Sequence, residues 1–303
     1  MKTGFVSLVG RPNAGKSTLL NRLVGTKLAI VSDKPQTTRT RIVGVRNYPD
    51  AQVVYVDTPG IHRPLHRMNV RMVDAAVETI ADVDLVGLVV DVTEPPGKGD
   101  RYVLDMLKDA KAPAFLILNK IDLIRKNRLL PLIQQYASLN AFAEIVPVSA
   151  TTGDNVDRLE RAIIDRLPEG EPMYPPDYLT DQPERFFAAE IVREKVLQFT
   201  RDEIPFSSAV VVDRFEEAAR ESGAPRQSDE AGQMLKLYCT ILVDRESQKP
   251  IVVGRGGEMI KRIGVAARED LERFFDTRVF LDLRVRVRSE WREDEQVLND
   301  LGL

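Results

Sequence analysis

The residues with the clearest chemistry form a glycine-rich string, GRPNAGKS, at positions 10–17. It matches the pattern G-x-x-x-x-G-K-[ST], whose glycines let consecutive backbone N–H groups curl around a phosphate. Lys16 would bring a positive charge to the β- and γ-phosphate oxygens, and the hydroxyl of Ser17 would bind Mg²⁺. The pattern predicts a nucleotide-binding loop. Its candidate residues are Gly10, Arg11, Pro12, Asn13, Ala14, Gly15, Lys16, Ser17 and Thr18.

A second string, DTPG, directly follows the apolar run VVYV. Asp57 is placed to hold the Mg²⁺ shell through water, and the N–H of Gly60 to sense a γ-phosphate. An isolated string of this kind is equally typical of a simple turn. The candidate nucleotide-binding residues here are Asp57, Thr58, Pro59, Gly60 and Ile61.

A third string, NKID, follows the run AFLIL and favours guanine as the base. The carboxylate of Asp122 can accept the N1 and N2 protons of guanine, whereas adenine offers no such pair of donors. Lys120 can lay its aliphatic stem across the purine, and Asn119 can tie this loop to the phosphate loop. Farther along, Ser149 and Ala150 can supply backbone N–H groups for guanine O6. Together with the phosphate loop, these residues favour GTP over ATP.

The fourth string, KPQTTRTR at positions 34–41, contains two adjacent threonines and no apolar periodicity. We expect a loop that places one threonine hydroxyl on Mg²⁺, with Thr38 as the first choice and Thr37 as the alternative. A solvated loop with no metal role is the other interpretation. The predicted metal-binding residues are therefore Ser17, Thr38 and Asp57.

In this order the strings resemble the translation-factor-related GTPases, and QTTR together with DTPGIH resembles the bacterial Era family among them. The resemblance covers nearly the whole chain. It implies hydrolysis of GTP to GDP and phosphate with Mg²⁺ as cofactor, a switch I loop at residues 34–41 and a switch II loop that begins at DTPG. In similar GTPases the asparagine at the position of Asn13 helps to bind K⁺ near the β/γ bridge. Its other interpretation is a residue that stabilises the loop by hydrogen bonds.

One departure concerns catalysis. Ras-type enzymes carry a water-orienting glutamine directly after D-x-x-G, and this chain has Ile61 there, which cannot polarise water. His62 is an alternative base, although we expect it to be a surface residue of the switch loop. Hydrolysis should be slow without activation. The predicted catalytic residues are Lys16, Thr38, Gly60 and Asn13.

The site residues follow apolar runs that must position them. Five such runs, which begin at Phe5, Gln52, Asp84, Ala114 and Glu144, alternate with helix-period segments. This alternation predicts a doubly wound, mostly parallel α/β sheet. The segment RTRIVGVRNY should form a hairpin with VVYVD and add an antiparallel edge. We place this GTP-binding domain at residues 1–168, a proline-rich linker at 169–183 and a smaller α+β domain at 184–303.

The smaller domain should contain a helix, two strands, a helix and a strand, and it carries GRGG between a strand-like run, IVV, and an amphipathic helix. This is the arrangement of a KH GXXG loop, whose glycines let the backbone approach single-stranded nucleic acid. The predicted RNA-binding residues are Gly254, Arg255, Gly256, Gly257, Lys261 and Arg262. The residues Ile251, Val253, Ile260 and Ile263 would wall a groove for bases, or belong to the core.

Basic residues cluster around this loop, with Arg268 and Arg273 on the helix and Arg284, Arg286 and Arg288 at strand period, although acids interrupt them. A solvated face is the other interpretation. Residues 218–233 should form a mobile hairpin extension. The resemblance to Era implies that the RNA is the 3′ end of small-subunit ribosomal RNA, bound during assembly of the small ribosomal subunit.

The composition limits the classes of function and the cellular compartments that fit the chain. The chain has 303 residues, 43% of them hydrophobic, and a net charge of −3, so nucleic-acid affinity must be local. Its only cysteine, Cys239, lies in an apolar run, which predicts a buried residue and a reducing compartment. We expect a cytoplasmic monomer with no membrane span, and peripheral contact with the inner face of the membrane stays open.

Two other functions fit the same sequence. One is a nucleotide-stabilised RNA-binding scaffold in which hydrolysis is incidental. The other is a GTPase whose C-terminal domain binds protein or a membrane surface.

Overall fold

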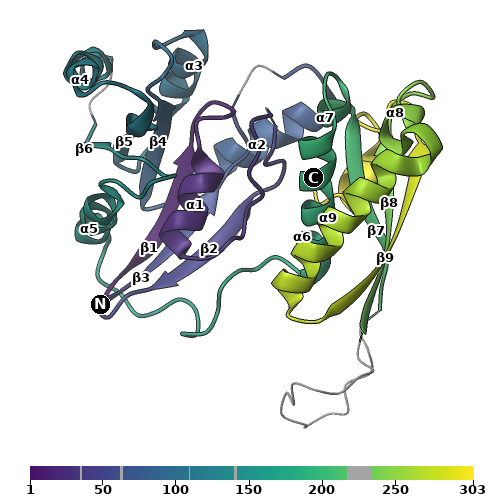
Figure 1. The fold of residues 1–303 in the computed structure, drawn as a ribbon. Helices are drawn as coiled ribbons and strands as arrows, with labels where there is room; N and C mark the ends of the chain where they lie inside the picture. The colour runs from purple at the N-terminus through teal and green to yellow at the C-terminus, as the bar shows by residue number, and fades with distance from the viewer. Residues whose placement is uncertain (35, 62–63, 109, 140–141, 217–233) are drawn as a thin grey trace. The chain divides into compact units, whose positions relative to one another are not determined.

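The chain folds into two compact units, residues 1–181 and 182–302 (Figure 1). The computed structural model describes all residues except 35, 62–63, 109, 140–141 and 217–233. Two predictions fall on undescribed residues: the base role of His62, and the hairpin extension at 218–233.

The first unit is built on a six-stranded sheet in the order β2-β3-β1-β4-β5-β6. The strands β1 (Lys2–Val9), β3 (Ala51–Asp57), β4 (Leu85–Asp91), β5 (Ala114–Asn119) and β6 (Glu144–Pro147) pair in parallel. The edge strand β2 (Ile42–Asn47) pairs antiparallel with β3. The predicted doubly wound sheet with an antiparallel edge is confirmed.

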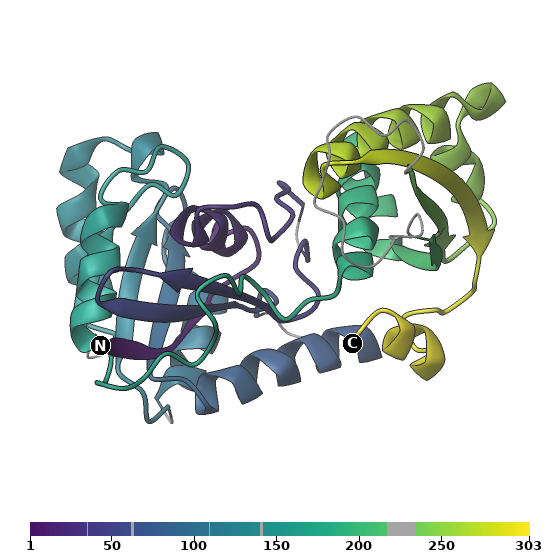
Figure 2. The same ribbon diagram turned by 90° about the horizontal axis from the view of Figure 1, so that it is seen from below.

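Helices cover both faces of this sheet, which explains why its strands are apolar without alternation. The helices α2 (Arg67–Ala81), α3 (Lys98–Leu107) and α4 (Leu129–Ala137) pack on one face in a buried cluster with β4 and β5. The helix α1 (Lys16–Val24) lies in front of the sheet in Figure 1, and Figure 2 shows α1 and α2 on opposite sides of the strands. The helix α5 (Val156–Arg166) packs against β1 and β6. Short 3₁₀ turns at Ile121–Leu123 and Lys126–Arg128 precede α4.

Residues 169–181, which we call the strap, pack on the first unit although their composition is that of a linker. The stacked rings of Tyr174 and Tyr178, with centroids 4.6 Å apart, cover valines of β2 and β3. The N–H of Val45 in the edge strand donates to the carbonyl of Leu179 at 2.8 Å. These contacts cover the exposed edge of the sheet, a position that otherwise invites pairing with another chain.

The side chain of Gln52 anchors the strap. It is 1% exposed, and its Oε1 accepts the N–H groups of Met173 at 2.7 Å and Tyr174 at 2.9 Å. Its Nε2 donates to the carbonyl of Tyr174 and to Asn47 Oδ1, both at 2.8 Å. One buried amide therefore fixes the path of the strap through three hydrogen bonds, and a fourth holds the amide to Asn47.

We predict that Gln52→Ala lowers the free energy of unfolding by about 2 to 3 kcal/mol, because it leaves the backbone groups of the strap without partners. Urea denaturation of the variant measures this change. The exposed Gln134 on α4 is the matched control, and Gln134→Ala should stay within about 0.5 kcal/mol of the parent. Equal stability of the two variants would refute the anchoring role.

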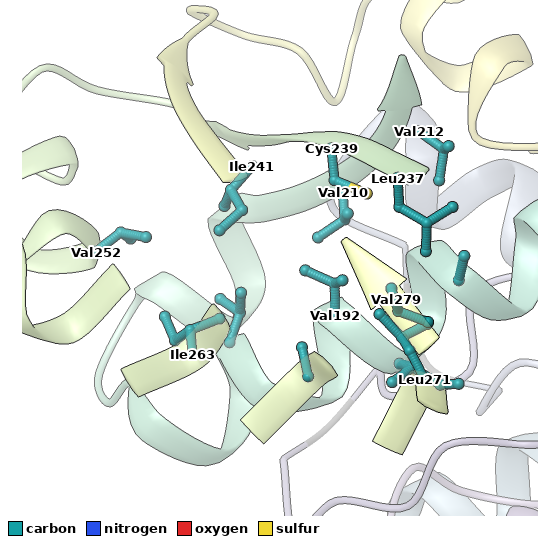
Figure 3. Packing of buried hydrophobic residues seen from close by; sticks show 14 of the residues in the cluster. Val192, Val210, Val212, Leu237, Cys239, Ile241, Val252, Ile263, Leu271 and Val279 are labelled. Carbon is teal, nitrogen blue, oxygen red and sulfur yellow. The ribbon is translucent and has the colours of Figure 1, made fainter. Parts of the chain in front are cut away.

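The second unit has a three-stranded sheet in the order β7-β8-β9, formed by Ser208–Glu216, Met234–Val243 and Arg278–Val287. The strands β7 and β8 are antiparallel, and β8 and β9 are parallel. The helices α6 (Glu184–Phe199) and α9 (Glu258–Phe275) pack on one face of the sheet, where Val192, Cys239 and Ile263 meet in the core (Figure 3). Shorter helices are α7 (Ile204–Ser207), α8 (Lys249–Val253) and α10 (Glu295–Asp300).

The prediction of a strand-like run directly before GRGG is wrong, because Lys249–Val253 forms the helix α8. Pro250 suits the first turn of a helix, and the Oε1 of Gln248 accepts the N–H groups of Asp244 and Arg245 just before it. Helical spacing buries Val252 completely and leaves Ile251 47% exposed. Three apolar residues ahead of a glycine are too few to specify a strand.

The prediction that Cys239 is buried is confirmed, since its side chain is 1% exposed. Burial, with Asp213 and Asp282 nearby, raises the pKa of its thiol to about 12. Only about one thiol in 10,000 is then ionised at pH 8, and the thiolate is the reactive form. We predict that the folded protein reacts with a disulfide reagent at pH 8 far more slowly than the urea-unfolded chain. Equal rates would contradict this burial.

Candidate functional site

The phosphate loop connects β1 to α1 and requires glycine at its ends. Gly10 has φ 151°, and a Cβ there would lie 2.3 Å from the carbonyl oxygen of Val89. Gly15 has φ 92°, and a Cβ there would lie 2.2 Å from Asn119 Nδ2. Larger residues would meet both strain and collision, so the loop keeps its tight curve.

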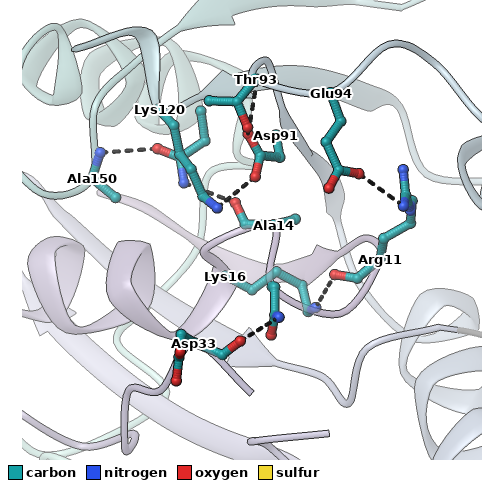
Figure 4. Close-up of polar contacts among 11 residues, drawn as sticks. Arg11, Ala14, Lys16, Asp33, Asp91, Thr93, Glu94, Lys120 and Ala150 are labelled. Carbon is teal, nitrogen blue, oxygen red and sulfur yellow. Dashed lines mark hydrogen bonds and ion pairs between the residues drawn. The ribbon is translucent and has the colours of Figure 1, made fainter. Parts of the chain in front are cut away.

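Lys16 is buried at the centre of this loop. Its Nζ donates to the carbonyls of Gly10 at 3.2 Å and Arg11 at 3.0 Å, the second of which Figure 4 shows. Burial lowers the pKa of Lys16 to about 8, although the carboxylate of Asp57 opposes the change. The ammonium group is thus poorly compensated, and a phosphate would supply the missing negative charge.

Oxygen atoms from three separate elements converge beside Lys16. Ser17 Oγ donates to Asp57 Oδ2 at 2.7 Å and lies 2.7 Å from Thr38 Oγ1, which itself lies 3.2 Å from Asp57 Oδ2. The three residues predicted to bind metal are therefore adjacent. Thr37, the alternative, donates its hydroxyl to the carbonyl of Lys34 at 2.6 Å.

Asp57 is fully buried, and its Oδ1 has no hydrogen-bond partner among the described residues. Burial raises the pKa of Asp57, while Lys16 and the hydroxyls of Ser17 and Thr38 lower it. Hard oxygen donors with one unsatisfied carboxylate oxygen suit Mg²⁺, which keeps waters and takes phosphate oxygens as further ligands. The described residues contain no cluster of three His, Cys, Asp or Glu that could hold a metal without such help.

The residues after Asp57 pack against the phosphate loop. A Cβ on Gly60 would lie 2.7 Å from Pro12 Cα, so glycine permits the close approach. The N–H of Ile61 donates to the carbonyl of Gly10 at 3.0 Å, and its side chain belongs to the core between β4 and α2. Thr58 is buried and donates to the carbonyl of Leu8 at 2.9 Å. Pro59 connects Thr58 to Gly60.

Asn119 connects the phosphate loop to the guanine end of the site. Its Nδ2 donates to the carbonyl of Ala14 at 2.9 Å, and its Oδ1 accepts the N–H of Ala150 at 3.0 Å. Ser149 is buried beside it, and Asp122 is exposed. A cavity of about 400 Å³, lined in part by Lys16, Thr18 and Lys120, lies along the phosphate loop.

Sequence reasoning missed the acidic partners of two basic residues at the site, Lys120 and Arg11. Lys120 Nζ lies 2.5 Å from Asp91 Oδ2. Arg11 turns its guanidinium away to Glu94 at 3.0 Å and Asp100 at 3.2 Å, so only its backbone faces the loop (Figure 4). Asp91 could have been found, because it ends β4 in register with Asn119 at the end of β5.

Asn13 has φ 63°, and its Nδ2 donates to the carbonyl of Asp33 at 2.7 Å. This contact links the phosphate loop to the segment that leads to Thr38. It agrees with the loop-stabilising interpretation of Asn13.

We predict that Asn119→Ala weakens GDP binding by about 10- to 100-fold, because two buried hydrogen bonds of about 1 kcal/mol or more are lost. Fluorescent-nucleotide titration measures the affinity. Asn47→Ala is the matched control, since Asn47 also donates one side-chain hydrogen bond and accepts another, at the strap. A loss of affinity in the control as large as in Asn119→Ala would contradict the bridging role.

The second unit presents GRGG between α8 and α9. Gly254, Gly256 and Gly257 all have positive φ, at 76°, 61° and 83°. A Cβ on Gly256 or Gly257 would meet nothing within 4 Å, so this side of the loop is open to a ligand. Arg255 is exposed at its tip.

The predicted RNA-binding side chains differ in their surroundings. Lys261 and Arg262 are both exposed, and the guanidinium of Arg262 lies 4.3 Å from the ring centroid of Phe199. Among the predicted groove residues, Ile251 is exposed and Ile263 is fully buried in the core. Ile263 therefore cannot wall a groove.

None of the described helices is long and apolar enough to cross a bilayer.

Comparisons with known proteins match a family model to each of the two units. A sequence model described as 50S ribosome-binding GTPase matches residues 5–120, and a KH domain model matches residues 232–292. GTPase Era of Geobacter metallireducens is 50% identical over 99% of this chain and 97% of the relative. GTPase Era of Syntrophus aciditrophicus is 50% identical over 99% of this chain and 95% of the relative.

Two solved structures match the whole chain. A variant of Aquifex aeolicus Era bound to GDP and AlF₄⁻ has a TM-score of 0.92 at 39% identity, and covers 100% of this chain and 99% of its own. A structure of Era in complex with MgGDPNP and nucleotides 1506–1542 of 16S ribosomal RNA has a TM-score of 0.92 at 40% identity, with the same coverage.

Fold and site together define a P-loop GTPase domain followed by a KH domain. The phosphate loop, the converging oxygens and the Asn119 bridge belong to the first, and GRGG belongs to the second. The chain belongs to the Era family of GTPases.

Proposed function

We propose that this GTPase acts as a switch that binds the single-stranded 3′ end of small-subunit ribosomal RNA during assembly of that subunit. The observation that carries the switch is the convergence of Ser17, Thr38 and Asp57, because it joins the phosphate loop to the loop that precedes β2. The Era structure with 16S ribosomal RNA supports the choice of ligand for GRGG.

Ser17, Thr38 and Asp57 would hold Mg²⁺, and the unpartnered Oδ1 of Asp57 supports this role. When bound, the ion neutralises charge on the β- and γ-phosphate oxygens. Lys16 would bring its ammonium to the same oxygens, and the backbone N–H of Gly60 would sense the γ-phosphate. Asp122 would accept the N1 and N2 protons of guanine, and Lys120 would cover the base.

Hydrolysis by these groups should be slow without activation. The buried side chain of Ile61 cannot orient water, so catalysis rests on positioning and on the charges of Lys16 and the metal. Asn13 would help to hold K⁺ near the β/γ bridge, where a cation neutralises developing charge as an arginine finger does.

We predict that K⁺ raises the single-turnover rate of GTP hydrolysis several-fold over Na⁺ at equal ionic strength, and that Asn13→Ala removes this difference. The measurement is phosphate release in each salt, with GDP affinity as the control for loop integrity. Equal rates in the two salts, or a K⁺ effect that persists in Asn13→Ala, would refute the role of Asn13.

A continuous path supports coupling between Thr38 and the second unit. Thr38 lies four residues before β2, the edge strand whose Val45 is bonded to the strap at Leu179. Arg41 also reaches Asp181 at 3.8 Å. The strap ends directly before Gln182, where the second unit begins. A nucleotide that orders Thr38 can therefore act on the start of the RNA-binding unit.

The decisive experiment compares RNA affinity with a non-hydrolysable GTP analogue and with GDP at fixed salt, using RNA of nucleotides 1506–1542. We predict different affinities in the two states. The double variant Arg255→Asp/Gly256→Asp should abolish binding in both, because it places two negative charges where the backbone meets phosphates. Equal affinities would remove the coupling.

The same titration separates the other functions. A scaffold with incidental hydrolysis predicts that RNA does not stimulate single-turnover hydrolysis. A C-terminal unit that binds protein or a membrane surface predicts no specific RNA binding in the parent chain, so the double variant would have nothing to lose.

A further inference from the structure

One face of the β7–β8–β9 sheet is used by neither proposed site. Side chains alternate between the faces of a strand. Leu237, Cys239 and Val279 point to the face covered by α6 and α9, where they join the core. Their alternate neighbours therefore form an opposite face, which we call the outer face. Its main residues are Arg214, Lys236, Tyr238, Arg278, Phe280, Asp282, Arg284 and Arg286.

The outer face carries more positive than negative charge, although the whole chain has a net charge of −3. Its acids are already engaged. Asp282 pairs with Arg284 at 3.1 Å and Glu216 with Arg214 at 3.5 Å. The third acid, Asp213, accepts the hydroxyl of Thr240 at 2.7 Å.

Three cations of this face, Lys236, Arg278 and Arg286, have no ion pair among the described residues. All three are exposed. Along β9, Arg284 and Arg286 are two positions or about 6.6 Å apart, whereas Arg278 lies eight positions or about 26 Å before Arg286. The free positive charge is thus spread along the strands and not gathered at one point.

Two aromatic rings lie among these cations. Tyr238 and Phe280 have ring centroids 5.8 Å apart, and Phe280 is 43% exposed. The guanidinium of Arg214 lies 4.3 Å from the centroid of Tyr238. In the sheet, Lys236 is directly opposite Phe280, and Arg278 is two residues before it. A half-exposed ring beside free cations offers a stacking surface next to sites for anions.

We propose that the outer face is a second binding surface for single-stranded RNA, with phosphates at Lys236, Arg278 and Arg286 and one base stacked on Phe280. This inference rests on the proposed function, since the RNA is a continuation of the strand held at GRGG. GRGG precedes α9, which packs on the other face of the sheet, so the two surfaces are distinct.

The chemistry of the face favours RNA over an acidic protein. A nucleic acid brings a negative charge with every residue and a flat ring for stacking, which matches spaced cations around an exposed aromatic ring. An acidic peptide brings carboxylates but no base at each residue to stack on Phe280. Two linked contacts on one RNA also reinforce each other through effective concentration.

The test uses an RNA with the sequence of nucleotides 1506–1542 of 16S ribosomal RNA and measures its affinity for the protein by fluorescence anisotropy at several salt concentrations. We expect Lys236→Ala/Arg286→Ala to weaken binding about 10-fold and to reduce the slope of log K against log salt by about 1 to 2. The matched control is Lys111→Ala/Arg161→Ala, which removes one lysine and one arginine from exposed positions of the first unit, outside every proposed site, and should change affinity less than about 3-fold. Arg286→Lys keeps the charge and should keep the affinity.

Phe280 tests the stacking part separately. We expect Phe280→Leu, which keeps apolar volume but removes the ring, to weaken binding about 5- to 50-fold, whereas Phe280→Tyr should bind as the parent does. In chemical footprinting, the outer-face variants should lose protection of one RNA segment and retain protection of another. The double variant Arg255→Asp/Gly256→Asp should lose protection of the RNA segment that the outer-face variants still protect.

The outcomes distinguish the two claims. If the parent chain does not bind the RNA, the proposed function fails and this surface fails with it. If the parent binds, and the outer-face variants match it in affinity, salt slope and footprint, then only the outer face is refuted. Urea midpoints equal to that of the parent show that the exposed substitutions leave the fold intact.

Discussion

The nucleotide site depends on burying two opposite charges, Lys16 and Asp57, at the carboxyl end of β1 and β3. Within the part of the chain that the structure describes, neither charge is fully compensated. The hydrogen bonds of Lys16 Nζ there go to carbonyls, and burial lowers its pKa, while Asp57 Oδ1 has no hydrogen-bond partner. Burying charged groups is costly unless each one is paired. A phosphate together with a cation removes both deficits, so the site is organised around a ligand.

The same constraint explains why the loops around the site are held so firmly. Asn119 joins the phosphate loop to the guanine end, and the backbone of Ile61 joins it to the residues after DTPG. Glycines at Gly15 and Gly60 allow these close approaches. Thr38 contributes a hydroxyl from a loop that leads directly into the edge strand β2. The strap covers that strand, and the proposed coupling would use this connection.

The second unit is small and is built on one three-stranded sheet. A single sheet buries one face under α6 and α9 and leaves the other in water. The open GRGG loop brings backbone close to a ligand, while the outer face offers spaced cations and an exposed ring. A short KH domain can in this way present two chemically different surfaces to one flexible polymer.

Local sequence determined much of this protein. Five apolar runs predicted the five parallel strands of the first unit, since a buried parallel sheet requires near-continuous apolar strands, and the hairpin segment RTRIVGVRNY predicted the antiparallel edge. The spacing of the four strings predicted that Lys16, Ser17, Asp57 and Asn119 would meet, because the carboxyl ends of parallel strands share one edge. The same reasoning failed at Ile251–Val253, where a three-residue run carries no periodicity.

Only the tertiary structure decided which side chains of those strings face the ligand. It paired Arg11 with Asp100 and Glu94, buried Ile61 in the core, and placed Thr38, not Thr37, beside Asp57. It also turned a proline-rich segment into a strap through Gln52. These outcomes depend on contacts between residues distant in sequence, where the desolvation of a polar atom is offset by a partner that no local pattern identifies.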